Sequence, residues 1–487
     1  MESVSQAISS TAKKTNWRWV ICSLLFFATT INYLDRQVLS LTWKDFIAPE
    51  FHWTDSDYGD ITGFFSLFYA VVSLFAGKVV DFLGSRKGYL VAISVWSGAA
   101  CLHALCGWAT IHITGLDSVE ALYDVKAGSA MALSVASVSV WLFLACRALL
   151  ALGESGNFPA AIKVTAQYFP KMDRAFATAV FNAGASVGAL AAPLCIPPLA
   201  KEYGWEMAFL IIGALGFVWM FFWDRMYKKP QDSKYVNQAE LQYIMQDSEN
   251  ESETEIKKEE TTTIPFWHCF KYRQTWAFIT GKAFTDGVWW FFLFWAPAYF
   301  SDQFGYTSYS PQGQALIFVL YLIVTLLSIA GGYLPRLFVE KKGMNPYAGR
   351  MRAMLIFAFV PILALFAQPL GLYSAWYPAI IIGLAGAAHQ AWSANLYSTI
   401  GDMFPTSTVG SIVGIGTMAG GLSAYIINKG SGVLFDYAAS MGESFGFMTF
   451  SGKPAGYMIV FSICAIAYLS AWCVMKLLVP RYKKIEI

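Results

Sequence analysis

Residues 77–87 read GKVVDFLGSRK, and this short charged stretch joins two long apolar runs. A helix that crosses a membrane needs about 20 predominantly apolar residues, and each of the two runs provides them. Gly77 allows close helix approach, and Asp81 stands near Arg86 and Lys87, where a charge network can form. The pattern predicts a tight turn between two membrane-spanning helices. Arg86 and Lys87 would fix the topology, and we expect all three charged residues to form a gating loop as well, because a charge latch stabilises one of two conformations.

The rest of the chain repeats this pattern of long apolar runs. Of its 487 residues, 56% are hydrophobic and 14% are charged, against about 25% charged in a typical soluble domain. Such a chain cannot hide its apolar side chains in one aqueous core, so lipid must be part of its solvent. We therefore predict an all-α polytopic membrane protein with twelve transmembrane helices in two six-helix bundles. The runs begin near Trp17, Ile61, Tyr89, Ala132, Phe176, Met207, Trp276, Gln314, Ala353, Trp376, Val409 and Tyr457.

A polar stretch separates the first six runs from the last six. Most of its acidic residues lie between positions 247 and 260, and it is expected to be a solvated linker, with partner binding as the alternative. The predicted organisation is an N-terminal tail (1–16), a first bundle (17–226), the acidic linker (227–272), a second bundle (273–479) and a C-terminal tail (480–487).

Lys and Arg are distributed unevenly between the two sets of loops. The tails and one set of loops are rich in them, whereas the opposite loops carry little beyond Lys44, Lys126, Lys201 and Lys453. Because cytoplasmic loops of membrane proteins are enriched in Lys and Arg, both termini and the linker are predicted to face the cytoplasm. The expected location is the inner (plasma) membrane.

Ionisable residues interrupt the apolar runs and are costly there, so each is a functional hypothesis. Two of them are seven residues apart and two are four apart, so each of these pairs shares one helix face. The alternative is that the pairs neutralise each other and only hold helices together. The six residues are Asp35, Arg36, Arg147, Glu154, Lys282 and Asp286.

Buried acids beside arginines suggest a coupled switch. A carboxylate next to an arginine stays ionised, and it takes up a proton when that arginine is drawn to another partner. Asp35 and Glu154 could each pair with Arg36 or Arg147 in this way. An anionic solute that binds Arg36 would release Asp35 to take up a proton, which amounts to symport of a proton with an anion.

Several further motifs accompany the charged loop at 77–87. They are INYLDR (31–36), GESGNFPAA (153–161), FNAG (181–184), GKAFTD (281–286), AHQAWSAN (388–395), DMFP (402–405) and VGSIVGIG (409–416). Together these motifs resemble the anion:cation symporter family of the major facilitator superfamily, and within it the bacterial hexuronate transporters. The resemblance runs from about Trp17 to about Phe435 and implies two six-helix halves with the solute between them.

The resemblance implies roles for the residues at matching positions. Arg36 corresponds to the arginine that meets the substrate carboxylate, and Tyr33 and Tyr69 correspond to tyrosines that line the site. Asp35 and Glu154 correspond to the protonation sites, with Arg147 as the coupling arginine. Further solute-binding positions in the second half are Lys282, Gln390, Trp392, Ser393 and Asn395.

Three positions depart from galactonate-type relatives. Lys282 replaces a Gln, Ala185 replaces a second Gln, and GTMAGG at 416–421 lacks an Asn. These changes remove amides that could bind a linear polyol, which favours a cyclic hexuronate over an open-chain aldonate. The predicted function is uptake of glucuronate or galacturonate by proton symport, with Arg36 and Lys282 on the carboxylate. Symport of another organic anion is the alternative.

Other classes of protein fit the sequence poorly. No nucleophile–base set, metal-ligand cluster or phosphate loop is apparent, so a membrane-embedded enzyme is a weak rival. The eight cysteines form no C-x-x-C pair and are interpreted as packing residues. A net charge of +2 argues against a nucleic-acid partner. We expect no cofactor and no metal, with protons as the coupling ion, the lipid bilayer as surroundings and a functional monomer.

Overall fold

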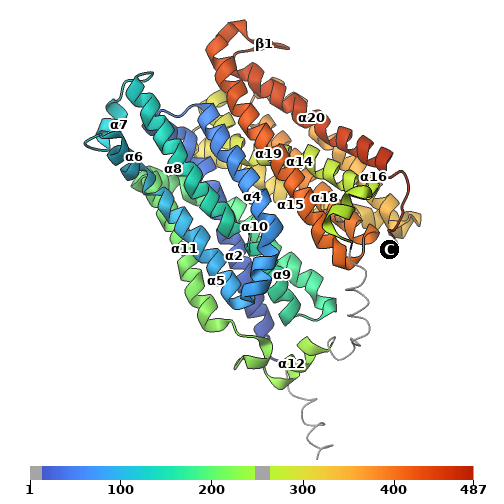
Figure 1. Cartoon of the computed structure of the whole chain (residues 1–487). Coiled ribbons are helices and arrows are strands. Elements are labelled where there is room, and N and C mark those ends of the chain that lie inside the picture. The colour runs from blue at the N-terminus through green and yellow to red at the C-terminus, as the bar shows by residue number, and fades with distance from the viewer. Residues whose placement is uncertain (1–13, 247–263, 486–487) are drawn as a thin grey trace, which may run out of the picture.

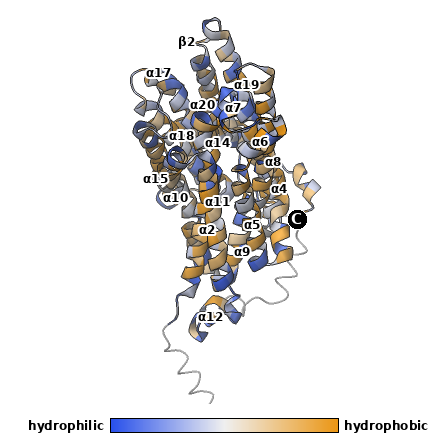
Figure 2. Ribbon diagram, turned by 90° about the vertical axis from the view of Figure 1, so that its left-hand side faces the viewer, coloured by the Kyte–Doolittle hydropathy of each residue, from blue (hydrophilic) through white to orange (hydrophobic). Residues whose placement is uncertain are grey.

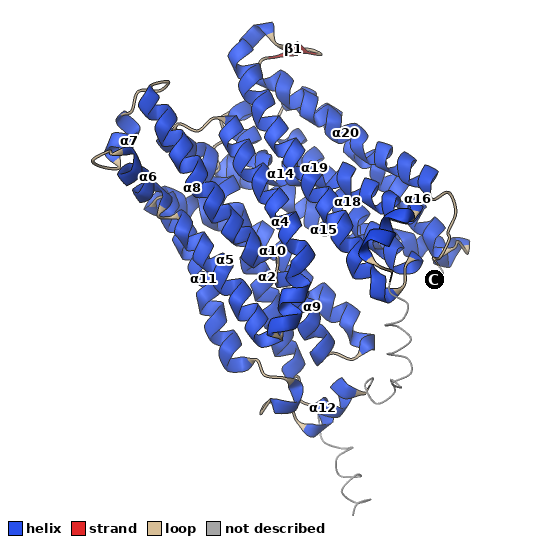
Figure 3. Cartoon of the chain, viewed as in Figure 1, coloured by secondary structure: helices blue, strands red, loops and turns tan. Residues whose placement is uncertain are grey.

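The computed structural model describes residues 14–246 and 264–485, and almost all of this part is helical (Figure 3). The described strands are β1 (Gly446–Phe447) and β2 (Phe450–Ser451), which pair antiparallel in a short hairpin. The acidic residues between 247 and 260 lie outside the described residues, as do most of the N-terminal tail and the last two residues of the C-terminal tail.

In the first half, each predicted span corresponds to a helix or to a bent pair of helices. The third span bends by 53° between its two helices. The helices are α2 (Trp17–Thr42), α4 (Asp55–Leu83), α5 (Ser85–His103) with α6 (Cys106–Thr114), α8 (Ala130–Glu154) followed by α9 (Asn157–Tyr168), α10 (Lys171–Tyr203) and α11 (Trp205–Met226). Shorter elements between them are η1 (Trp43–Ile47), α3 (Ala48–Phe51) and α7 (Glu120–Asp124).

The second half follows the same plan. Its third span is broken by a 3-10 turn that begins beside Pro361, because proline lacks the N–H that an α-helix needs. The helices are α14 (Arg273–Phe304), α15 (Pro311–Lys342), α16 (Pro346–Phe359) with η4 (Val360–Phe366) and α17 (Ala367–Gly371), α18 (Trp376–Met403), α19 (Thr406–Met441) and α20 (Lys453–Leu478). Before α14 and after α19 lie η3 (Phe266–Lys271) and η5 (Gly442–Ser444).

The two halves pack against each other along their lengths. Helix α4 runs beside α19, α10 contacts α15, and α2 contacts α14 (Figure 1). We call the end of the bundle that carries α12 (Gln238–Met245) and the C-terminus the terminal end, and the end that carries α7 and β1 the far end (Figure 1). Hydrophobic residues cover the helices between these two ends (Figure 2).

Within the described ranges, eight helices are long and apolar enough to cross a membrane, or nine if the bent α5–α6 pair is one span. Helices α2, α14 and α18 are as long but are not among them. They contain the ionisable and polar residues singled out in the sequence, including Arg36, Lys282 and Gln390. Three of the helices that contribute to the candidate site are therefore less apolar than the other long helices, whereas α8, which carries Arg147 and Glu154, is among the eight.

The first part of the predicted linker is folded rather than fully solvated. Helix α12 places Glu240, which has no exposed surface, at the start of α2. Its carboxylate accepts the backbone N–H groups of Trp17 (3.1 Å) and Arg18 (3.2 Å) and pairs with the Arg18 side chain at 3.0 Å. A negative charge at a helix N-terminus is favourable, so α12 anchors this segment to the first half.

Helices α2 and α10 approach closely at Gly184. A Cβ at Gly184 would overlap the carbonyl oxygen of Phe26. Gly184→Ala is therefore expected to destabilise the protein by about 1–3 kcal/mol, the usual range for overpacking a tight contact. The measurement is the midpoint of thermal unfolding in detergent. Gly98→Ala is the matched control, because a Cβ at Gly98 meets nothing within 4 Å and should be neutral or slightly stabilising. Equal midpoints for the two variants would contradict the close approach.

A buried carboxylate lies outside the spans at the far end of the first half. Glu50 in α3 is 2% exposed and accepts hydrogen bonds from the Trp205 indole (2.7 Å) and the Tyr123 hydroxyl (3.1 Å). Burial raises the pKa of Glu50 from 4.5 to about 7, and nearby Glu206 adds to the rise, while the two hydrogen bonds oppose it. The folded protein therefore holds this proton more tightly than the unfolded chain does.

This raised pKa predicts a pH-dependent stability. The contribution of Glu50 is complete below about pH 4.5 and is lost as the pH rises through about 7, a change of about 3 kcal/mol at most. Glu50→Gln keeps an oxygen for the Trp205 N–H and removes the charge. We expect its thermal midpoint to exceed that of the wild type at pH 8 but not at pH 5. Parallel pH profiles for the two proteins would contradict the assignment.

Candidate functional site

A buried ion pair lies at the centre of the first half. Arg36 in α2 donates to Oε2 of Glu154 at the end of α8, from Nη2 at 2.6 Å and from Nε at 3.0 Å. The two side chains are 5% and 0% exposed. Two charge-assisted bonds to one carboxylate hold the guanidinium in a fixed orientation, whereas Oε1 of Glu154 has no hydrogen-bond partner.

Four aromatic rings surround the Arg36 guanidinium. Its central carbon lies 5.2 Å from the ring centre of Tyr33, 4.9 Å from that of Tyr69, 5.3 Å from that of Trp290 and 5.9 Å from that of Phe65. The structure therefore brings together the predicted residues Tyr33, Arg36 and Tyr69. Trp290 belongs to α14 in the second half and was not among the predicted site residues, although it follows Asp286 by one helical turn.

Asp35 and Arg147 are buried without an ion pair in the described part of the chain. Each is 2% exposed. Neither carboxylate oxygen of Asp35, and neither Nε nor Nη1 of Arg147, has a hydrogen-bond partner. Glu154 and Arg147 are both electrostatic neighbours of Asp35. The four predicted residues thus gather in one region, but it is Glu154, rather than the adjacent Asp35, that pairs with Arg36.

A second buried ion pair lies in the second half, on α14. Nζ of Lys282 is 2.6 Å from Oδ2 of Asp286, and the side chains are 8% and 11% exposed. Oδ1 of Asp286 is buried without a hydrogen-bond partner. Nζ of Lys282 also lies 4.9 Å from the ring centre of Tyr397. Tyr397 was not among the predicted site residues, whereas Asp286 was predicted from its four-residue spacing to pair with Lys282.

Two observations link this pair to Arg36. Trp290 lies one turn beyond Asp286 on α14 and packs against the Arg36 guanidinium. Tyr33, which lies against Arg36, and Tyr397, which lies against Lys282, come from opposite halves and are near enough to interact electrostatically. The two ion pairs therefore face one central region between the halves.

The predicted residues of α18 lie deeper in the second half. Trp392 is 0% exposed and packs edge-on against Tyr468, with 5.6 Å between ring centres. The Asn395 side chain is 5% exposed and donates from Nδ2 to the carbonyl of Ala391 on its own helix at 2.8 Å. Gln390 and Ser393 are half-buried. In this conformation Trp392 has no surface to offer a solute, so its role stays a prediction.

The charged turn at 77–87 is paired differently from the expected network. Asp81 accepts from Nζ of Lys163 on α9 at 2.7 Å, and Arg86 pairs with Asp224 on α11 at 2.8 Å. Asp81 and Arg86 therefore reach neighbouring helices of the first half instead of each other, and Lys87 is exposed. The turn lies at the terminal end, and its gating role stays a prediction.

Four charged residues join the two halves at the far end. Lys44 lies 3.3 Å from Asp55 and 2.9 Å from Asp302, and Lys453 lies 2.6 Å from Asp55 and 2.5 Å from Asp302. We call these residues the far-end network. The sequence showed Lys44 and Lys453 only as isolated cations in sparsely charged loops, and no motif indicated that they meet.

Further polar contacts close the far end around this network. Asp436 of α19 accepts the backbone N–H groups of Asp55 (3.0 Å) and Ser56 (2.8 Å) at the start of α4. Asp45 of the first half accepts from the Ser301 hydroxyl (2.8 Å) and the Ser308 backbone N–H (2.6 Å) of the second. Both acids tie one half to the other, so this conformation is shut at the far end.

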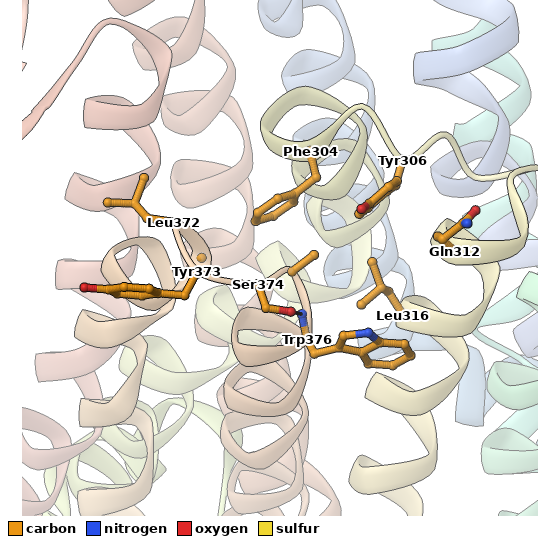
Figure 4. A pocket seen from close by; sticks show the side chains of 10 residues that line it. Phe304, Tyr306, Gln312, Leu316, Leu372, Tyr373, Ser374 and Trp376 are labelled. Carbon is orange, nitrogen blue, oxygen red and sulfur yellow. Dashed lines mark hydrogen bonds between the residues drawn. The ribbon is translucent and has the colours of Figure 1, made fainter.

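A separate pocket of about 330 Å³ opens at the far end of the second half (Figure 4). Its lining includes Phe304, Tyr306, Gln312, Leu316 and Trp376 and contains no charged residue. None of the predicted site residues lines it, so it is not the candidate site. Within residues 14–246 and 264–485, no group of three or more His, Cys, Asp or Glu side chains could hold a metal ion.

Comparison with known proteins agrees with the helical plan. A family model described as Major Facilitator Superfamily matches residues 25–427, and the chain belongs to this family. It is a multi-pass membrane transporter and not an enzyme.

The chain is similar to transporters of sugar acids. It is 27% identical over 420 residues to the hexuronate transporter of Escherichia coli K12, covering 86% of this chain and 88% of that protein. It is 26% identical over 363 residues to the galacturonate transporter of Dickeya chrysanthemi, covering 74% and 93%. The D-galactonate transporter of Escherichia coli O6:H1 is 25% identical over 426 residues, covering 85% and 89%.

Solved structures show the same fold. An inward-facing, occupied bacterial homolog of the human lysosomal transporter Spinster superposes with a TM-score of 0.64 at 17% identity, covering 96% of this chain and 97% of that one. A D-xylose-proton symporter superposes with a TM-score of 0.61 at 15% identity, covering 94% and 98%.

Proposed function

We propose that this protein takes up a hexuronate, such as galacturonate or glucuronate, together with a proton. The buried Arg36–Glu154 pair carries the proposal, because it is an arginine fixed between aromatic rings whose counter-ion is a carboxylate. A solute carboxylate has the same geometry and charge as Glu154 and can take its place on Arg36. The similarity to hexuronate and galacturonate transporters supports the substrate class.

The exchange of carboxylates on Arg36 couples solute to proton. Glu154 is fully buried, so once the solute displaces it from Arg36, an unpaired charge there would be costly. Glu154 then takes up a proton. Asp35, which has Arg147 beside it, provides a second carboxylate that can take up or release a proton. In this scheme the site keeps its net charge when one monoanion and one proton bind together.

The second half completes the site. Lys282 already faces the central region, whereas Gln390, Trp392, Ser393 and Asn395 would join the solute as the halves rock, since Trp392 is buried in the present conformation. The Lys and Arg residues concentrated at the terminal end support an orientation with both termini in the cytoplasm and the protein in the inner (plasma) membrane. The monomer contains both halves and is the proposed functional unit.

An aldonate is the second candidate, favoured by the similarity to the D-galactonate transporter. The polarity of the site argues against an aldonate. Ala185, Lys282 and Gly416 to Gly421 provide no side-chain amide for a linear chain of hydroxyls.

Uptake into proteoliposomes tests the function. The purified protein is reconstituted, and labelled galacturonate is added with an acidic exterior, with a sodium gradient alone, or with no gradient. We expect accumulation only with the pH gradient, abolished by a protonophore, and competition by glucuronate but much weaker competition by galactonate. Accumulation driven by sodium would overturn the proton assignment, and preference for galactonate would overturn the hexuronate assignment.

A further inference from the structure

Lys282 is not a free cation in this structure. Asp286 holds it at 2.6 Å, four residues along the same helix. Helix α19 presents Gly420 to this pair, and a Cβ at Gly420 would overlap the Asp286 carboxylate. The glycine therefore makes room for the acid to lie against Lys282, so the charge on Lys282 is balanced locally before any solute binds.

The pair offers both kinds of hydrogen-bonding group that a sugar hydroxyl needs. Oδ1 of Asp286 is a buried acceptor without a partner. Nζ of Lys282 carries three N–H donors, only one of which is needed for Oδ2 of Asp286. A hydroxyl that lies between them can donate to Asp286 and accept from Lys282. The Tyr397 ring, 4.9 Å from Nζ, limits the space beside them.

A second carboxylate would meet a different situation at this pair. The central region contains the cations Arg36, Arg147 and Lys282 and the acids Asp35, Glu154 and Asp286, so its formal charges cancel. One solute carboxylate on Arg36 with one proton on Glu154 preserves that balance. Another carboxylate beside Asp286 would place two anions together in a buried site, and like charges there are strongly unfavourable.

We propose that the Lys282–Asp286 pair recognises the hydroxyl end of the solute and excludes dicarboxylates, which makes the site selective for sugar acids with one carboxylate. The inference rests on the proposed function and reassigns Lys282 from the solute carboxylate to its hydroxyls. Asp286 becomes the residue that discriminates a uronate from an aldarate, because repulsion of the wrong ligand provides selectivity as effectively as attraction of the right one.

Competition binding tests the proposal, with galacturonate and galactarate as the matched ligands. The two share their hydroxyl configuration and differ in the second carboxylate of galactarate. For the wild type we expect galactarate to compete with labelled galacturonate at least about a hundredfold less well than unlabelled galacturonate does. Asp286→Asn leaves the charge of Lys282 without a counter-ion. The ratio of the competing concentrations of galactarate and galacturonate should therefore fall at least tenfold, mainly because galactarate binds more tightly. Adding Lys282→Gln to that variant should remove the gain.

A second variant leaves both charged side chains in place. Gly420→Ala should push the Asp286 carboxylate away from Lys282 and weaken galacturonate binding at least fivefold. Gly430→Ala on the same helix is the control, because a Cβ there meets nothing within 4 Å. Size-exclusion profiles and thermal midpoints show whether each variant is folded. If Asp286→Asn does not fold, galacturonate binding by Gly420→Ala tests the role of the pair instead.

The outcomes separate this inference from the proposed function. If the wild type binds galacturonate and Asp286→Asn leaves the ratio unchanged, the selectivity role of the pair is wrong and the function stands. If Gly420→Ala binds like Gly430→Ala, the role of the pair is likewise wrong. If the wild type binds no sugar acid, the proposed function fails and the inference fails with it.

Discussion

Replacing Arg36 with alanine is expected to lower the affinity for the transported sugar acid at least about a hundredfold. The variant removes a charge-assisted contact in a buried site, and loss of such a contact costs about 3 kcal/mol or more, which corresponds to that factor. It also leaves Glu154, which is 0% exposed, without its partner. Breaking a buried ion pair from one side destabilises a protein by about 3–5 kcal/mol, so the thermal midpoint should fall as well. Equilibrium binding and thermal unfolding of the purified protein measure the two effects.

Glu154→Gln is the matched variant for the same ion pair. It removes the carboxylate that competes with the solute for Arg36 but keeps a neutral side chain of the same shape. We expect exchange of labelled for unlabelled solute to continue, with affinity equal to or higher than that of the wild type, while accumulation driven by a pH gradient is lost. Unchanged affinity in Arg36→Ala would disprove the carboxylate-binding role. Full pH-driven accumulation in both Glu154→Gln and Asp35→Asn would disprove the proton assignment.

Removing both lysines of the far-end network is expected to open that end of the protein. In Lys44→Gln with Lys453→Gln, the carboxylates of Asp55 and Asp302, whose side chains are 6% and 12% exposed, face each other across the halves without a cation. Their repulsion should expose residues beneath the network, such as Thr62 on α4, which is 2% exposed. A single cysteine at position 62, in a background without the native cysteines, should react with a hydrophilic maleimide at least tenfold faster than without the lysine changes.

A surface ion pair provides the control for this experiment. Asp224→Asn breaks the pair with Arg86 at the terminal end, where the side chains are 55% and 46% exposed. Exposed pairs contribute about 0–1 kcal/mol, so the reaction rate at position 62 should not change. Equal rates in the double lysine variant and the wild type would show that the far-end network does not hold the halves together.

The sequence predicts the helices well because their cause is local. A run of about 20 apolar residues favours a spanning helix, and all twelve predicted starts lie inside an observed helix, at most seven residues after its first residue. The breaks in the third spans of both halves could not be located in this way, since the hydropathy of a segment is the same whether its helix is straight or bent. The grouping of Tyr33, Tyr69 and Arg36 follows from family motifs rather than from hydropathy.

The sequence left open which charges pair between different helices, because that pairing depends on the relative positions of distant helices. Asp35 adjoins Arg36 in the sequence, but neighbouring residues of an α-helix point about 100° apart, so the two face different surroundings. The partner of Arg36 is Glu154, which is 118 positions further along the chain. The far-end network draws its residues from four separate segments, and no single stretch of sequence contains its pattern.

The far-end network has a property that depends on which half supplies each charge. Lys44 and Asp55 belong to the first half, and Asp302 and Lys453 belong to the second, so each half contributes one cation and one anion. When the halves part, the contacts Lys44–Asp302 and Lys453–Asp55 are lost, but each half keeps a neutral pair of its own. Separation of the halves therefore breaks two ion pairs but leaves no uncompensated charge on either surface. The network holds the far end shut without making its opening prohibitively costly, which suits a transporter whose halves must part in every cycle.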